Sequence, residues 1–224
     1  MQDDQDIPVY KVGAVILRQR PDAGHTSQGN AVEGDTIEAL IVRPHPTQNN
    51  GTLPNLALPR GSRKFDTGKK DEHGNVIWQD IRNLEDAKAA VHRRWEPVAE
   101  TLLREMKEEA GIQRADLLKS ADVYEMEERP YASPGKGETY PVYWYVVWAD
   151  DAMIKNMDNP PEHSSEARWC TLNELKNLVS EEHPEHSQFS KGYYDVVKEA
   201  IMPSVYESLK PANLKAQQVK ERQL

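Results

Sequence analysis

Blocks of apolar and β-branched residues, separated by polar turns, run through the chain and predict a mixed α/β protein. Four blocks rich in Val, Ile, Tyr or Trp are expected to be strands: residues 9–17, 38–43, 123–128 and 140–149. The last block has too few polar positions for a surface strand, so we expect it inside the sheet. Residues 167–175 are predicted to be a strand that turns into a helix. Residues 189–209 repeat apolar positions at helical spacing, with Pro203 as a boundary.

Clusters of Gly, Pro, Asn and Asp mark the connections between these elements. Loops are expected at residues 18–36, 49–51, 129–138 and 159–166, and a hairpin tip at residues 71–75. Residues 84–95 are predicted to hold a short helix. Helices packed on a mixed sheet accommodate this order of elements.

Residues 97–110 have a start, a stop and two distinct faces when they are placed on a helix. Pro97 suits the first helical position, and Gly111 suits the left-handed position just past the end. One face carries an apolar stripe that is expected to pack on the core: Ala99, Leu103, Met106 and Ala110.

Another face of this helix carries three carboxylates, Glu105, Glu108 and Glu109, at positions i, i+3 and i+4. Like charges at this spacing oppose helix formation. Oxygen ligands of this kind suit Mg²⁺ or Mn²⁺, and a bound cation would turn the repulsion into attraction. The alternative is a solvated acidic face that binds nothing.

The acidic pattern is longer than these three residues. Glu96 is followed, after seven residues, by Arg104-Glu105-Met106-Lys107-Glu108-Glu109-Ala110-Gly111-Ile112. This run resembles the Nudix box, and residues 8–180 resemble the Nudix hydrolase family. The resemblance implies an α/β/α sandwich with a mixed β-sheet, in which the box forms a strand, a loop and a helix.

The segment Leu58-Pro59-Arg60-Gly61 is similar to the one that opens the box in this family, whose glycine offers its carbonyl to the metal. That glycine normally lies a few residues before the first box glutamate, whereas residues 62–95 separate Gly61 from Glu96 here. We interpret residues 62–95 as an insertion within a domain of residues 1–182, followed by a C-terminal helical extension, residues 183–224. The Arg and Lys residues of the insertion either clamp substrate phosphates or only keep it soluble.

The resemblance also implies roles for individual residues. The metal would be held by Glu105, Glu108, Glu109 and Gly61, while Arg104 would form a structural ion pair with Glu96. The catalytic carboxylate would come from the helix or from a later loop, with four candidates: Glu108, Glu109, Glu162 and Glu166. The candidates for binding substrate phosphates are Arg60, Arg63 and Lys64.

The implied function is a divalent-metal-dependent pyrophosphohydrolase that cleaves a phosphoanhydride in a substrate of the nucleoside diphosphate–X type. The Leu-Pro-Arg-Gly segment resembles that of members acting on dinucleoside polyphosphates or diphosphoinositol polyphosphates. The alternative is a non-catalytic Nudix-fold module that senses a nucleotide or sugar phosphate. Such modules usually lose box carboxylates, which this chain keeps.

Composition limits the partners. A formal net charge of −9 argues against a bulk electrostatic grip on nucleic acid. The single cysteine, Cys170, excludes an intrachain disulfide and is compatible with a reducing cytoplasm. The first residues lack a signal-peptide pattern, and no apolar run is long enough to span a membrane. We therefore expect a cytoplasmic protein that binds a small-molecule diphosphate and no membrane. A homodimer is the oligomer considered.

Overall fold

The computed structural model describes twelve segments of the chain: residues 11–20, 37–45, 55–81, 84–90, 92–113, 123–125, 129–132, 139–149, 151–155, 157, 161–179 and 188–201. The turn predicted at residues 49–51, most of the loop at 18–36 and the helix boundary at Pro203 lie outside these segments.

The strand predicted to be interior lies between neighbours in a seven-stranded sheet. This strand, β8 (Thr139–Trp148), pairs in parallel with β1 (Lys11–Gln19). On its other side it pairs antiparallel with β6 (Val123–Glu125) and β7 (Arg129–Ala132). The sheet is therefore mixed, as the sequence predicts.

The other side of β1 carries two antiparallel neighbours, one at each end. The first residues of β1 pair with β3 (Arg60–Ser62), and its last residues pair with β2 (Ile37–Pro44). β2 pairs in turn with β9 (Ser164–Thr171), which continues into helix α5 (Leu172–Leu178). A capping box between Thr171 and Glu174 starts α5, so the predicted strand-to-helix segment is confirmed.

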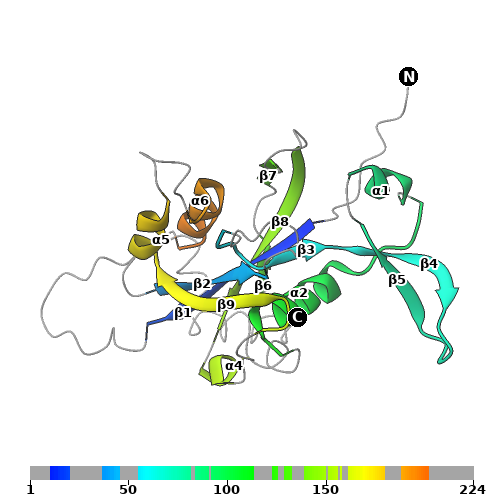
Figure 1. Cartoon of the computed structure of the whole chain (residues 1–224), viewed down its shortest axis with the longest axis horizontal. Coiled ribbons are helices and arrows are strands. Elements are labelled where there is room, and N and C mark those ends of the chain that lie inside the picture. The colour runs from blue at the N-terminus through cyan, green and yellow to red at the C-terminus, as the bar shows by residue number, and fades with distance from the viewer. Residues whose placement is uncertain are drawn as a thin grey trace, which may run out of the picture.

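Helices cover both faces of this sheet (Figure 1). Helix α2 (Val98–Ala110) and the short α4 (Asp151–Lys155) lie on one face, while α5 and α6 (Lys191–Ala200) lie on the other. β8 serves both faces because side chains alternate along a strand. Trp144 and Val146 pack with α5 and α6, whereas Val147 packs with α2. The predicted α/β sandwich is present.

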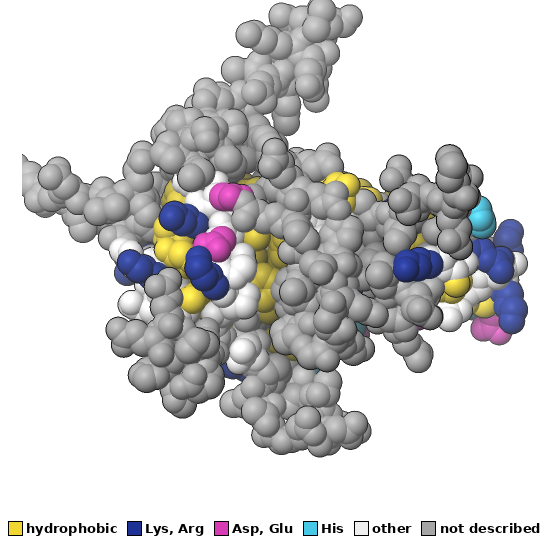
Figure 2. Space-filling model, turned by 90° about the horizontal axis from the view of Figure 1, so that it is seen from above, with side chains coloured by type: hydrophobic (Ala, Val, Ile, Leu, Met, Phe, Trp, Pro, Cys, Tyr) yellow, Lys and Arg dark blue, Asp and Glu magenta, His cyan; other side chains and the backbone are white. Residues whose placement is uncertain are grey.

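The insertion forms an arm that projects from the sheet (Figure 1). Strands β4 (Lys64–Lys70) and β5 (Val76–Asp80) form a separate two-stranded sheet, followed by α1 (Leu84–Ala89). The hairpin tip lies where it was predicted, and the Asp71 carboxylate accepts hydrogen bonds from the backbone N–H groups of His73 and Asn75. Basic side chains gather at the far end of the arm, at the right of Figure 2, where Lys69 and Lys70 are exposed.

Two segments differ from the predicted local structure. Residues 129–132, expected in a loop, form β7, because the edge of a sheet tolerates a proline such as Pro130 that lacks an N–H to donate. The short helix predicted within residues 84–95 is present but ends at Ala89, so only part of that segment is helical. Its remainder returns beside β4, where the Asp66 N–H donates to Arg94 O at 2.7 Å and the Glu96 N–H donates to Lys64 O at 2.8 Å.

None of the helices in the described segments combines the length and apolar character needed to cross a bilayer.

Candidate active site

Helix α2 starts and ends close to the predicted positions. Pro97 is its N-cap rather than its first residue, with φ −55° and ψ 141°. Gly111 ends it at φ 72°, a left-handed conformation that glycine adopts without strain. The predicted apolar stripe is partly wrong, because Ala99 is exposed and Leu102 takes its place in the core with Met106 and Ala110. The helix is rotated so that its acidic side also faces protein.

Two of the three box carboxylates, Glu105 and Glu109, lie against β3 and not on a solvated surface. Glu105 is only 7% exposed, and its carboxylate lies where a Cβ on Gly61 would be. Only a glycine therefore lets β3 approach the helix so closely. Glu109 accepts a hydrogen bond of 2.8 Å from the Arg60 backbone N–H. The alternative of a solvated acidic face does not fit this packing.

Burial disfavours the charged forms of Glu105 and Glu109. Desolvation raises the pKa of Glu109 to about 7, and the nearby Glu105 adds to this, although the hydrogen bond from Arg60 opposes it. Desolvation also raises the pKa of Glu105, against the attraction of Arg104. Two buried acids that repel each other form a site that a cation would stabilise.

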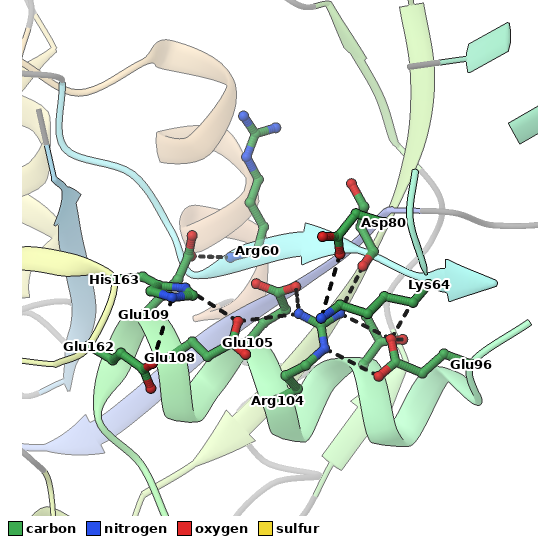
Figure 3. Close-up of polar contacts among 12 residues, drawn as sticks. Arg60, Lys64, Asp80, Glu96, Arg104, Glu105, Glu108, Glu109, Glu162 and His163 are labelled. Carbon is green, nitrogen blue, oxygen red and sulfur yellow. Dashed lines mark hydrogen bonds and ion pairs between the residues drawn. The ribbon is translucent and has the colours of Figure 1, made fainter. Parts of the chain in front are cut away.

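Arg104 is the centre of the polar network on this face (Figure 3). Its guanidinium lies 3.0 Å from Glu96 Oε2, which is the ion pair that the family resemblance implied, and it also contacts the carboxylates of Glu105 and Glu108. A further hydrogen bond of 2.8 Å reaches the carbonyl of Ser62. Arg104 therefore joins the first box glutamate, the acidic helix and β3.

Glu96 anchors the base of the arm to the same network. Its carboxylate accepts hydrogen bonds from Arg104, from the Thr101 hydroxyl at 3.0 Å and from the Lys64 backbone N–H at 3.2 Å. Burial would raise the pKa of Glu96, but these partners, Arg104 first, hold it below its usual value. Glu96 is thus an ionised group that ties the arm to α2.

The side chains of α2 also complete the outer edge of β3. Alternate residues of a strand direct their backbone groups to the same side. Arg60 offers its N–H to Glu109, and Ser62 offers its carbonyl to Arg104. These two side chains take the place of a neighbouring strand, which fixes the distance between β3 and the acidic helix.

The structure separates the two later carboxylates that the sequence could not distinguish. Glu166 is not in a loop but in β9, where it pairs with Arg43 at 2.8 Å and with Arg168 at 3.4 Å. Glu162 lies in the turn before β9, beside His163. Of the two, Glu162 is the one that joins the carboxylate network of α2 (Figure 3).

His163 makes that connection, and the sequence did not single it out. Its backbone N–H donates to Glu108 O at 2.7 Å, and its Nδ1 lies 3.3 Å from Glu108 Oε2. Its Nε2 lies 3.9 Å from Glu162 Oε1. The carbonyl of Glu108 belongs to the last turn of α2, where no intrahelical donor is available. His163 therefore fastens the turn that carries Glu162 to the end of the helix.

The three basic candidates occupy different places. The Arg60 side chain points away from the carboxylates, towards α6, and its guanidinium lies 5.5 Å from the ring of Tyr193. Arg63 donates to the Glu96 carbonyl at 2.7 Å and lies over Trp95. Lys64 pairs with Asp80 at 3.5 Å. All three lie at or near β3, but Arg63 and Lys64 are engaged in holding the base of the arm.

Lys11, at the start of β1, is a site residue that the sequence analysis missed. Burial lowers the pKa of its ammonium to about 8 and Arg60 contributes, whereas Glu105 and Glu109 act in the opposite direction. The sequence feature that could have identified it is that Lys11 is the single charged residue in the predicted strand of residues 9–17.

The carboxylates provide the oxygen donors that a hard divalent cation requires. Within the described segments, no three His, Cys, Asp or Glu side chains converge closely enough to hold a metal ion as they lie. Arg104 separates Glu105 and Glu108 from a common point, and Glu109 is turned to Arg60. The chemistry of these residues nevertheless fits such an ion, because they are oxygen donors grouped on one helix and burial penalises the charge of Glu105 and Glu109.

Comparison with known families finds a match for part of the chain. Residues 94–193, a little under half of the chain, match the family model of the NUDIX domain. None of the curated proteins matches the sequence. Over these residues the chain is similar to the NUDIX domain, which occurs in hydrolases that act on pyrophosphate bonds and generally need divalent metal ions.

Several solved structures resemble the chain weakly. A C. elegans Ap4A hydrolase has 17% identity and a TM-score of 0.40, with 80% of this chain and 92% of that chain covered. A Nudix hydrolase from Alicyclobacillus acidocaldarius has 15% identity and a TM-score of 0.45, with 86% and 90% covered. The NUDIX domain of Shewanella oneidensis NrtR, solved with ADP ribose, has 13% identity and a TM-score of 0.43, with 86% and 85% covered. At these scores the similarity to the NUDIX domain rests on residues 94–193 alone.

Proposed function

We propose that this protein is a Mg²⁺- or Mn²⁺-dependent pyrophosphohydrolase that cleaves a phosphoanhydride in a small-molecule substrate of the nucleoside diphosphate–X type. The supporting observation is the packing of the buried Glu105 and the half-buried Glu109 against β3, where the pKa values of both are raised. Buried acids with raised pKa values and no structural need for burial are characteristic of functional sites.

The metal would be held by Glu105, Glu108 and Glu109, with the carbonyl of Gly61 as a further candidate ligand. A divalent cation at such a site draws charge from phosphoryl oxygens and lowers the pKa of a bound water. Glu105 and Glu109 supply the negative charge for this ion from within the protein, where electrostatic attraction is stronger than in water.

The remaining residues would orient these groups and move the proton. Arg104 holds the carboxylates of Glu105 and Glu108 at a fixed distance from β3, through Ser62. Glu109 on the helix, or Glu162 on the turn fastened by His163, would accept the proton of the attacking water. Glu166 is a weaker candidate for this role, since Arg43 already engages its carboxylate.

We infer a substrate with several phosphates, such as a dinucleoside polyphosphate or a diphosphoinositol polyphosphate. The inference is supported by the Leu-Pro-Arg-Gly segment and by the cations at β3, Arg60 and Arg63, which lie on either side of Gly61. Guanidinium groups suit phosphate because they donate in a planar, two-pronged geometry.

A substrate panel tests this proposal. Diadenosine tetraphosphate, ADP-ribose and a diphosphoinositol polyphosphate would each be incubated with the protein and Mg²⁺, Mn²⁺ or EDTA, and the products identified by ³¹P NMR. We expect metal-dependent cleavage of at least one phosphoanhydride substrate. Binding without cleavage under every metal condition would instead support the non-catalytic sensing module.

A further inference from the structure

Lys11 and Arg60 lie on the same face of the sheet, at the point where β1 and β3 meet. Lys11 pairs with Ser62 and Gly13 pairs with Arg60, so Lys11 and Arg60 are diagonal neighbours across the two strands. Side chains two residues apart share a face, which places Lys11 on the side of Val15 and Leu17. That side is the core shared with α5 and α6.

Aromatic rings border this place on the side of α6. The Arg60 guanidinium lies 5.5 Å from the Tyr193 ring, and Trp144 meets Tyr193 edge-on with the ring centroids 5.8 Å apart. Trp144 and Tyr193 are both at most 4% exposed. The cation–π contact with Tyr193 holds the Arg60 side chain in a defined direction, away from the carboxylates of α2.

Two cations placed together in a half-buried position repel each other. Burial lowers the pKa of Lys11 to about 8, and Arg60 contributes to this, while Glu105 and Glu109 partly compensate. A phosphate chain bound between Lys11 and Arg60 would relieve this repulsion, because both side chains lie on the same face of the sheet at the junction of β1 and β3.

We propose that Lys11 and Arg60 form a phosphate-binding subsite on the α6 side of β3, which holds phosphoryl groups beyond the pair that is cleaved. This proposal rests on the proposed hydrolase function, because the phosphate chain that the subsite binds is part of the hydrolase substrate. It selects a chain of three or more phosphates over a single diphosphate, because its two cations lie across β3 from the acidic helix.

Binding of inorganic tripolyphosphate in EDTA, measured by calorimetry, tests the subsite without catalysis. We expect Lys11→Met to weaken binding at least about tenfold and Lys11→Arg to retain it within about threefold. The matched control is Lys69→Met, which removes a lysine from the exposed end of the arm and should bind as the wild type does. Equal affinity of Lys11→Met and wild type, or no binding by the wild type, would overturn the proposal.

Footprinting of the wild-type protein provides a second measurement if Lys11→Met does not fold. Acetylation of Lys11 by acetic anhydride should fall at least about threefold when tripolyphosphate is added, while acetylation of Lys191, exposed on α6, stays constant. Unchanged labelling of Lys11 would reject the subsite.

The outcome is distinguishable from failure of the hydrolase proposal. Tripolyphosphate binding that depends on Lys11, in a protein that cleaves nothing in the substrate panel, would support the subsite and reject the hydrolase. Cleavage with KM unchanged in Lys11→Met would support the hydrolase and reject the subsite.

Discussion

Glu109 is the residue whose environment departs furthest from that of an ordinary surface glutamate on this helix. It is half-buried beside Glu105, and its carboxylate accepts a hydrogen bond from the Arg60 backbone N–H. A glutamine at this position is able to accept the same hydrogen bond through its amide oxygen but is a poor ligand for a hard cation. The chemistry and the fold are therefore separable at this residue.

Glu109→Gln should lower metal-dependent hydrolysis by at least about a hundredfold and leave the thermal midpoint at or above that of the wild type. Glu100→Gln, on the first turn of the same helix, is the matched control and should keep its activity. Phosphate release with the best substrate of the panel measures the first effect, and calorimetry the second. Full activity in Glu109→Gln would contradict its assigned role.

The raised pKa of Glu109 also predicts how stability depends on pH in the metal-free protein. Because its pKa is about 7 in the folded state and about 4.5 when unfolded, the folded state holds the proton more tightly. The contribution of Glu109 to the free energy of unfolding is therefore fully present below pH 4.5. It is lost as the pH rises through 7, by up to about 3 kcal/mol. Urea unfolding in EDTA should therefore show a fall in the free energy of unfolding of the wild type between pH 5 and pH 8. Glu109→Gln should lack this fall, so its stability relative to the wild type should be higher at pH 8 than at pH 5. Parallel pH profiles would contradict this.

Gly61→Ala tests the close approach of β3 to α2. An added Cβ overlaps the Glu105 carboxylate, and the side chain has to move away from Arg104 to make room. A displacement of about 1 Å in a catalytic constellation costs about a hundredfold in rate. We expect such a loss in activity, with a fall in stability of about 1–3 kcal/mol. The control is Gly68→Ala in β4, which meets no atom and should lose stability only through its positive φ.

At the scale of elements, the arm separates into a base and a far end. The base is tied to α2 by hydrogen bonds from Lys64 N–H to Glu96 and from Arg104 to Ser62 O. The far end carries Lys69 and Lys70 and forms its own two-stranded sheet. Basic residues that the sequence groups together therefore fall into two structural environments.

Replacing both Lys69 and Lys70 by Gln should leave KM within about twofold of the wild type, since exposed charges at this distance are screened by salt. Arg63→Gln, at the base, should raise KM or lower kcat because it releases the Glu96 carbonyl. Steady-state kinetics with one substrate at two salt concentrations compares them. A large rise in KM for the double variant would show that the whole arm clamps phosphate.

Helices and strands could be predicted from the sequence where a local pattern of residues is sufficient to determine them. The strand blocks around Val15, Val42 and Val146 and the cap at Gly111 follow from composition and backbone preference. β7 was missed because its pairing with β8 is a tertiary contact that overrides the proline signal. The acidic trio was predictable from helical spacing, but Lys11 and His163 reach it from distant strands and turns, so no local pattern reveals them.

At the scale of the whole molecule, the two faces of the sheet have different tasks. One face is covered by α2, the helix that carries the carboxylates. The other face is covered by α5 and α6 and holds the larger apolar cluster, which includes Trp144 and Phe189. Phe189 and Tyr193 lie within the segment that we predicted to be a C-terminal extension, residues 183–224. Their burial joins this segment to the core beneath the proposed subsite.

Because Phe189 and Tyr193 pack in the core, we expect residues 188–201 to be needed for folding. Phe189→Ala removes a fully buried ring and should destabilise the protein by about 3–5 kcal/mol, far more than a peripheral extension would allow. The matched control is Lys191→Ala, two residues further on at the start of α6, where the loss of an exposed pair with Asp195 should cost less than about 1 kcal/mol. Urea unfolding followed by tryptophan fluorescence reports both, because Trp144 lies in the same cluster. Equal stability of the two variants would mean that residues 183–224 form an extension independent of the core.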